Sequence, residues 1–161
     1  MNPNLRKLSP ILFGFALFCF VLPFLSISTK GFLGDSHKLG TLNGLELVIG
    51  PELRNQKQNP EPLAILALVA TLAGLAFSLF KEKILSVEKN FLIASTIAGA
   101  GGCLLLLLLK MQIDGEASRV MGMAGVSYEA GFWLAFLALL AAGGVNGFQL
   151  VSPASNAASA S

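Results

Sequence analysis

Ionisable residues are missing from four long stretches of this 161-residue chain. The stretches are residues 9–27, 62–80, 91–109 and 131–150, and none of them contains Asp, Glu, Lys, Arg or His. A hydrocarbon layer about 30 Å thick is crossed by about 20 apolar residues of helix, each rising about 1.5 Å. Each stretch therefore predicts a membrane-spanning helix. The missing charges exclude the usual chemistry of pumps and intramembrane proteases.

Charge is also scarce in the chain as a whole. Charged residues make up 12% of the sequence, whereas soluble domains carry about 25%. Hydrophobic residues make up 54%, and the net charge is only +2. No basic cluster is available to bind a phosphate backbone, so the sequence excludes nucleic acid as a partner and favours the lipid bilayer. The length predicts one domain, over residues 1–150.

Residues that carry chemistry are few. The two cysteines, Cys19 and Cys103, lie in predicted spans, where a thiol acts as a small hydrophobic group. His37 is the one histidine, and a protein metal site needs three or four ligands. Ser95 has no basic partner in any span to activate it. We therefore expect no catalytic residue, no cofactor, no metal site and no enzyme.

Basic residues are densest at the N-terminus and between the second and third stretches. They are Arg6, Lys7, Lys81, Lys83 and Lys89. The positive-inside rule places these segments in the cytoplasm. We therefore predict a multi-pass protein of the plasma or inner membrane with both termini cytoplasmic and with loops 28–61 and 110–130 outside.

Both outer loops contain residues that alternate between apolar and polar. Residues 25–28, where the chain leaves the first stretch, and residues 126–128 alternate in this way. After the turn signal Asn43-Gly44, Leu45, Leu47 and Ile49 alternate with Glu46 and Val48. An irregular loop on the lipid headgroups is the alternative. The predicted fold class is an all-α membrane protein, a four-helix transmembrane bundle with a small extracytoplasmic β-sheet or hairpin from these loops.

The end of the chain differs from the rest. Residues 151–161 consist of Val-Ser-Pro followed by Ala, Ser and Asn, without charge. Such a composition forms no core of its own. We predict a flexible C-terminal tail, which a partner would have to hold in order to give it structure.

Small residues form the most informative pattern inside the spans. Gly99, Gly101 and Gly102 lie in the third stretch, and Gly143 and Gly147 lie four residues apart in the fourth. Small residues let helix backbones approach closely in lipid. These glycines therefore predict either packing within this bundle or contact with a helix of another membrane protein.

Three local motifs sit where the predicted helices meet the outer loops. The first stretch carries Pro23-Phe24 near its end, the first loop carries Asn43-Gly44-Leu45, and the fourth helix opens with Gly131-Phe132-Trp133. These motifs and the four spans resemble the claudin-like tetraspan superfamily, which includes claudins, peripheral myelin proteins and auxiliary subunits of glutamate receptors. The pattern is also similar to that of small bacterial four-helix membrane proteins.

The chain departs from the claudin-like pattern at two points. Glu46 stands where the superfamily has a tryptophan, and the paired loop cysteines are missing. The resemblance implies a helix bundle capped by a small outer β-sheet and a role in contacting other proteins. It implies no enzyme.

These observations favour a non-catalytic accessory or structural subunit of a larger membrane complex. Its partners would be other integral membrane proteins or a second copy of the chain, bound through the glycine faces and the outer loop. A pore or transporter component is the alternative, because several spans contain uncharged polar residues. They are Thr71, Ser78, Ser95, Thr96 and Asn146. A further alternative is a subunit that holds a pigment or cofactor together with a partner.

Overall fold

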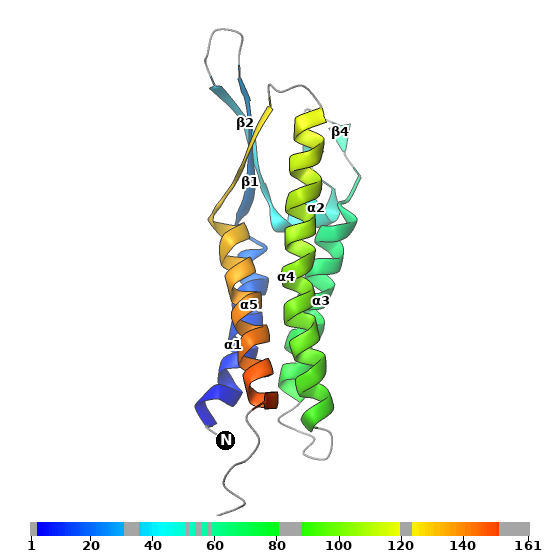
Figure 1. Cartoon of the computed structure of the whole chain (residues 1–161). Helices are drawn as coiled ribbons and strands as arrows, with labels where there is room; N and C mark the ends of the chain where they lie inside the picture. The colour runs from blue at the N-terminus through cyan, green and yellow to red at the C-terminus, as the bar shows by residue number, and fades with distance from the viewer. Residues whose placement is uncertain are drawn as a thin grey trace, which may run out of the picture.

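Apolar helices lie side by side along most of the molecule, with a small β-sheet at one end (Figure 1). The computed structural model describes residues 3–30, 36–50, 52–53, 56–57, 59–80, 88–119 and 124–151. The bundle consists of α1 (Pro3–Cys19), α3 (Pro62–Phe80), α4 (Glu88–Arg119) and α5 (Ala130–Val151). In Figure 1, α1 begins, α3 ends, α4 begins and α5 ends at the end of the bundle away from the sheet. We call this the inner end and the other the outer end.

Three helices in the described part of the chain are long and apolar enough to cross a membrane. They are α3, α4 and α5. Helix α3 has the bounds of the second predicted span, and α5 exceeds the fourth predicted span by one residue at each end. The chain thus has the helices of a multi-pass membrane protein and is mostly helical.

The prediction of a helix over residues 9–27 is wrong in its second part. Helix α1 ends at Cys19, and strand β1 (Pro23–Lys30) follows after a short turn. In this turn the N–H groups of Phe20, Val21 and Leu22 donate to carbonyls three residues earlier, at 3.0–3.1 Å. Proline has no N–H and disfavours helical geometry at the residue before it, so Pro23 prevents the helix from continuing.

Helix α1 packs into the bundle although it is short. Its 17 residues span about 25 Å. The Ser78 hydroxyl of α3 donates to the Ser9 hydroxyl of α1 at 2.8 Å, and both side chains are buried. One helical turn outward, the Phe13 ring lies against Gly74 of α3, which leaves room for it.

The prediction of a loop over residues 110–130 is wrong for residues 110–119. Helix α4 continues to Arg119, and its 32 residues span about 48 Å. Two side-chain pairs at four-residue spacing support the extension: Lys110 Nζ lies 2.5 Å from Asp114, and Gln112 donates to Glu116 at 3.3 Å. Such pairs stabilise a helix where it leaves the hydrocarbon.

The sheet at the outer end joins three distant segments of the chain. Strand β1 lies between β2 (Ser36–Asn43) and β5 (Ala124–Tyr128), antiparallel to both. Ser26 of β1 lies opposite Thr41 on one side and Ser127 on the other. The strands expected over residues 25–28 and 126–128 fall within β1 and β5. A separate two-stranded pair joins β3 (Glu52–Leu53) and β4 (Gln56–Lys57).

The expectation of a strand over residues 45–49 is wrong. These residues form the short helix α2 (Gly44–Ile49). The Asn43 N–H donates to the Glu46 carboxylate at 2.7 Å, which satisfies a donor at the start of the helix. Gly50 then ends the helix with φ of 99°, a backbone conformation that favours glycine. The local capping therefore overrides the two-residue alternation.

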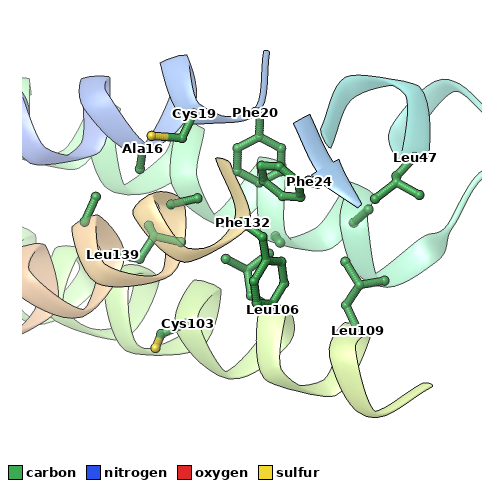
Figure 2. Close-up of a cluster of buried hydrophobic side chains, with 14 of the residues drawn as sticks. Ala16, Cys19, Phe20, Phe24, Leu47, Cys103, Leu106, Leu109, Phe132 and Leu139 are labelled. Carbon is green, nitrogen blue, oxygen red and sulfur yellow. The ribbon is translucent and has the colours of Figure 1, made fainter. Parts of the chain in front are cut away.

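Large buried side chains concentrate toward the outer part of the bundle (Figure 2). Fully buried there are Phe20, Phe24, Leu106, Leu109 and Phe132. Leu and Ile side chains on the outward faces of α3, α4 and α5 are instead exposed, as a surface facing lipid requires.

Two predicted features fall wholly or partly outside the described side chains. The tail predicted for residues 151–161 lies outside the described residues except for Val151, which ends α5. His37 lies in β2, where it is paired with Thr29 of β1.

Helices α4 and α5 approach each other closely at two glycines. A Cβ on Gly99 would lie 2.8 Å from the backbone nitrogen of Gly143, too close for any side chain. A Cβ on Gly143 would lie 3.2 Å from the backbone nitrogen of Ala100. Gly101, two residues further along α4, has no described neighbour within 4 Å of its Cβ position.

This difference predicts opposite effects for two alanine substitutions. Gly99→Ala forces α4 and α5 apart and should cost about 1–3 kcal/mol, the usual range for overpacking. Gly101→Ala, its matched control, adds helix propensity without a clash and should stabilise by about 0.5–1 kcal/mol. Thermal unfolding of both variants in the same detergent measures the difference. Equal shifts of the two midpoints would contradict the close crossing.

Candidate functional site

The three motifs of the outer loops and helix ends come together at one junction. Pro23 of β1 is paired with Asn43 of β2. The Leu45 N–H donates to the Phe20 carbonyl at 3.0 Å, and the Glu129 N–H donates to the Phe24 carbonyl at 2.9 Å. The segment from Phe20 to Phe24 thereby ties α1 to α2 on one side and to the start of α5 on the other.

Two glycines allow this junction to close. A Cβ on Gly44 would lie 2.9 Å from both the ring and the carbonyl oxygen of Phe20. A Cβ on Gly131 would lie 2.6 Å from the Pro23 carbonyl oxygen and 2.9 Å from Leu22. Since real Cβ atoms do not approach backbone this closely, any larger residue at Gly44 or Gly131 must displace the chain.

Aromatic rings fill the space beneath the junction. The Phe20 and Phe24 ring centroids are 5.0 Å apart, and Phe24 meets Phe132 edge-on at 5.9 Å. Figure 2 shows these rings beside Leu106 of α4. Tyr128 adds a fourth ring, 5.0 Å from Phe132. Such offset and edge-on pairs contribute about 0.5–1.5 kcal/mol each beyond the area they bury.

The motif residues divide into a buried and an outward-facing group. Phe24, Gly44 and Gly131 are buried and hold the junction together. Trp133 is 43% exposed, and Leu45 is also exposed. An amphipathic indole at the end of a membrane helix suits the lipid–water interface or a partner's surface.

A polar cluster covers the outer end of α4. The Tyr128 hydroxyl lies 2.8 Å from an Asp114 oxygen and 3.0 Å from the Lys110 carbonyl oxygen. The Lys110 ammonium lies 4.6 Å from the centre of the Tyr128 ring, within cation–π range. The hydrogen bond from Lys110 lowers the pKa of Asp114, whereas burial and the nearby Asp114 raise the pKa of Tyr128. This cluster, the Tyr128 clasp, fastens β5 to α4.

A second polar contact joins α4 to the start of α3. Gln112 donates to Glu61 at 3.2 Å and to Glu116 at 3.3 Å. Burial raises the pKa of Glu61, and repulsion from Glu116 raises it further, while the Gln112 hydrogen bond opposes this shift. The surroundings of Glu61 therefore disfavour its charged form.

The glycines of the predicted helix faces fall into two classes. Gly99 and Gly143 make the close crossing, and Gly102 lies near Leu139 of α5, 3.1 Å from its Cβ position. A Cβ on Gly147 would meet only Thr96, at an ordinary 3.6 Å. Gly101 alone of the predicted set has open surroundings among the described residues. Four of these glycines thus lie at or near the contact of α4 with α5.

Buried polar side chains occur inside the bundle. Thr71 donates back to the Ala67 carbonyl of its own helix at 2.7 Å. Asn146 is 0% exposed and Ser95 is 1% exposed, yet neither side chain has a hydrogen-bond partner within the described part of the chain. A buried polar group left in this state costs about 1–3 kcal/mol.

Where the chain is described, no group of three His, Cys, Asp or Glu side chains lies close enough to hold a metal ion. Cys19 and Cys103 are buried free thiols. Ser95 lies among the apolar helices, and the carboxylates described above lie at the outer surface. The described contacts thus assemble no nucleophile with its base.

Sequence reasoning missed the Tyr128 clasp and the unpartnered pair Asn146 and Ser95. The four-residue spacing of Lys110 and Asp114 was a signal for the clasp, because it indicates a continuing helix. An Asn inside an apolar stretch signals an expensive polar group. The periodicity of α5 alone does not show which of its faces points inward.

Comparisons with known proteins assign no family. No protein-family model matches the chain, and no curated protein matches it.

The raised pKa of Glu61 predicts a pH dependence of stability. Its folded-state pKa lies above the ordinary value of 4.5, so the folded protein keeps a proton that the unfolded chain has released. Stability should therefore fall as the pH rises from about 4.5 through the folded pKa. Glu61→Gln should raise the unfolding midpoint at pH 7. It should also reduce the rise in unfolding midpoint that the wild type shows when the pH is lowered to 5.

Glu116→Gln is the control for this experiment. It removes only the repulsion, which is the smaller of the two causes that raise the pKa of Glu61, so it should change the unfolding midpoint less and in the same direction.

Below about pH 4 stability should instead fall with falling pH, because protonation of Asp114 removes the stabilisation that its lowered pKa provides. Identical pH profiles for wild type and Glu61→Gln would refute this account of Glu61.

Proposed function

We propose that the chain is a non-catalytic accessory or structural subunit of a larger membrane complex. The observation that supports this most is the contrast between inward and outward glycines. Gly144, one residue after the close crossing, is exposed and has no described neighbour within 4 Å of its Cβ position. A glycine inside a helix costs about 1 kcal/mol relative to alanine, and no described contact of the chain requires this one.

The surface around Gly144 suits a second helix. Leu137 and Phe148 of α5, at 56% and 63% exposure, lie on either side of it along the helix. Ala141, between Leu137 and Gly144, is small and also exposed. A groove of small residues between large apolar ones lets a partner helix approach closely and gain van der Waals contact, the main source of helix association in lipid. We call the exposed side of α5 formed by Leu137, Ala141, Gly144 and Phe148 the docking face.

The outer junction supplies a second contact in this proposal. Pro23, Leu45 and Trp133 are the exposed members of the motif set. The Trp133 ring meets the buried Phe132 ring edge-on, and the Leu45 N–H donates to the carbonyl of buried Phe20. A helix bundle capped by a small β-sheet is also what the resemblance to the claudin-like superfamily implies. The partners in this proposal are other integral membrane proteins.

We further propose that α1 is a fourth crossing and that the sheet is extracytoplasmic. Helix α1 packs along α3 through Ser9 and Phe13, so it lies at the depth of the spanning helices. Its length of about 25 Å is short, and the buried rings of Phe20 and Phe24 continue the apolar layer. The basic residues near the N-terminus and between α3 and α4 favour a cytoplasmic inner end.

A pore between copies of the chain has less support. Of the five polar side chains that such a pore would use, Thr71, Ser78, Ser95 and Asn146 are buried within a single chain. The fifth, Thr96, is half-buried and donates to the Leu92 carbonyl of its own helix at 2.8 Å.

Cysteine labelling tests the four crossings and their direction. Ser118→Cys at the outer end of α4 should react with a membrane-impermeant maleimide in intact cells. Lys7→Cys and Asn90→Cys at the inner end should react only after permeabilisation. All three positions are exposed, whereas the native Cys19 and Cys103 are buried. Labelling of Lys7→Cys from the same side as Ser118→Cys would show that α1 does not cross.

Purification in mild detergent tests the subunit role. The chain should co-elute with a membrane protein partner, and Gly144→Leu should reduce the recovered partner at least tenfold while leaving the unfolding midpoint within about 2 °C. Gly14→Leu is the matched control, since this α1 glycine also has no described neighbour within 4 Å of its Cβ position. Recovery of a monomer without a partner, or equal recovery from both variants, would contradict the proposal.

A further inference from the structure

The buried polar side chains that lack partners lie at one level of the bundle. The close crossing of Gly99 with Gly143 and the nearness of Thr96 to Gly147 show that residues 95–99 of α4 run beside residues 143–147 of α5. Ser95 and Asn146 are the buried polar residues of these two segments. They belong to adjacent helices and lie one turn inward from the crossing.

This level contains more hydrogen-bonding capacity than the described chain uses. The Asn146 amide offers two donors and an acceptor, and the Ser95 hydroxyl can both donate and accept. Neither group bonds to another described residue, although Ser78 and Ser9 in the same half of the bundle bond to each other. In hydrocarbon no solvent reaches such groups unless the bundle itself admits it.

The chemistry of these atoms defines what binds there. A cation would be buried without a compensating charge, since no span contains an ionisable residue. A ligand for the pair must be neutral and must both donate and accept hydrogen bonds. It must also be small. The close crossing of Gly99 with Gly143, one helical turn away, keeps the two helix backbones near each other at this level.

We propose that Asn146 and Ser95 form an internal hydration site that holds water between α4 and α5. Water has the size, neutrality and dual hydrogen-bonding capacity that the site requires, and a buried water needs two to four polar partners. Gln149 is largely buried one turn closer to the inner end of α5.

Nuclear magnetic resonance of protein labelled with ¹⁵N-asparagine tests the site directly. The signal of the Asn146 side chain is assigned by its loss in Asn146→Leu. In rotating-frame spectra, dipolar transfer from a bound water and exchange with bulk water have opposite signs. Asn146 should show dipolar transfer, whereas Asn90, exposed at the start of α4, should show exchange only. Absence of any transfer from water to Asn146 would overturn the proposal.

Ser95→Ala provides a second measurement. If Ser95 binds the water, its loss should weaken the transfer to Asn146 and lower the unfolding midpoint by about 2–4 °C, the shift that loss of one hydrogen bond produces in a chain of this size. If the hydroxyl is merely buried and unpaired, removing it should raise the midpoint. A rise would exclude Ser95 from the site. Thr71→Val, which removes a hydroxyl bonded to its own helix, controls for the loss of a buried hydroxyl.

Discussion

The contact of two glycines with the segment from Phe20 to Phe24 is the constraint on which the outer architecture depends. This segment ends α1, begins β1, accepts hydrogen bonds from Leu45 and Glu129 and carries two of the buried rings. Gly44 and Gly131 press against it from opposite parts of the sequence. The sheet, α2 and the start of α5 therefore share one support. A side chain at either glycine would push its element away from this segment and strain the backbone hydrogen bonds of Leu45 and Glu129 to it.

The interior of the bundle differs between its outer and inner halves in the kind of side chains that fill it. Toward the outer end, aromatic rings and leucines fill the space and need no hydrogen bonds. Toward the inner end, glycines bring α4 and α5 together, and the remaining buried side chains include Ser9, Ser78, Ser95 and Asn146. Because lipid provides no partner for polar atoms, the inner half must satisfy them within the bundle. The two halves therefore differ in what holds their buried side chains: ring contacts in the outer half, and helix contact at glycines with a hydroxyl–hydroxyl hydrogen bond in the inner half.

The sequence predicted the apolar helices well and their ends less well. Helices α3 and α5 are bounded where charge or proline begins, so the composition located them to within one residue. Helix α1 was extended too far because residues 20–27 are as apolar as a span, and Pro23 acts on geometry and not on hydropathy. Helix α4 was ended too early because Lys110 marks the end of the hydrocarbon but not of the helix. Residues 45–49 fit both periods, and only the Asn43 and Glu46 cap distinguishes them.

Part of the candidate site could be predicted from the sequence. The motifs at Pro23, Asn43 and Gly131 had been assigned to the same outer region, and the structure brings them into contact. The direction in which a glycine faces depends on the rotation of its helix, and apolar helices with little amphipathic contrast do not reveal it. Gly99 and Gly101 are therefore indistinguishable in the sequence and opposite in the structure. For the same reason, the sequence does not show that Asn146 points into the bundle.

The length of α4 has a mechanical consequence. Its last ten residues project about 15 Å beyond Leu109 as a continuation of the same rod. The Tyr128 clasp fastens β5 to this projection. A tilt of α4 within the lipid would therefore displace β5, the edge strand of the sheet, sideways. A contact that changes the tilt of α4 within the membrane would therefore also move β5 at the outer end.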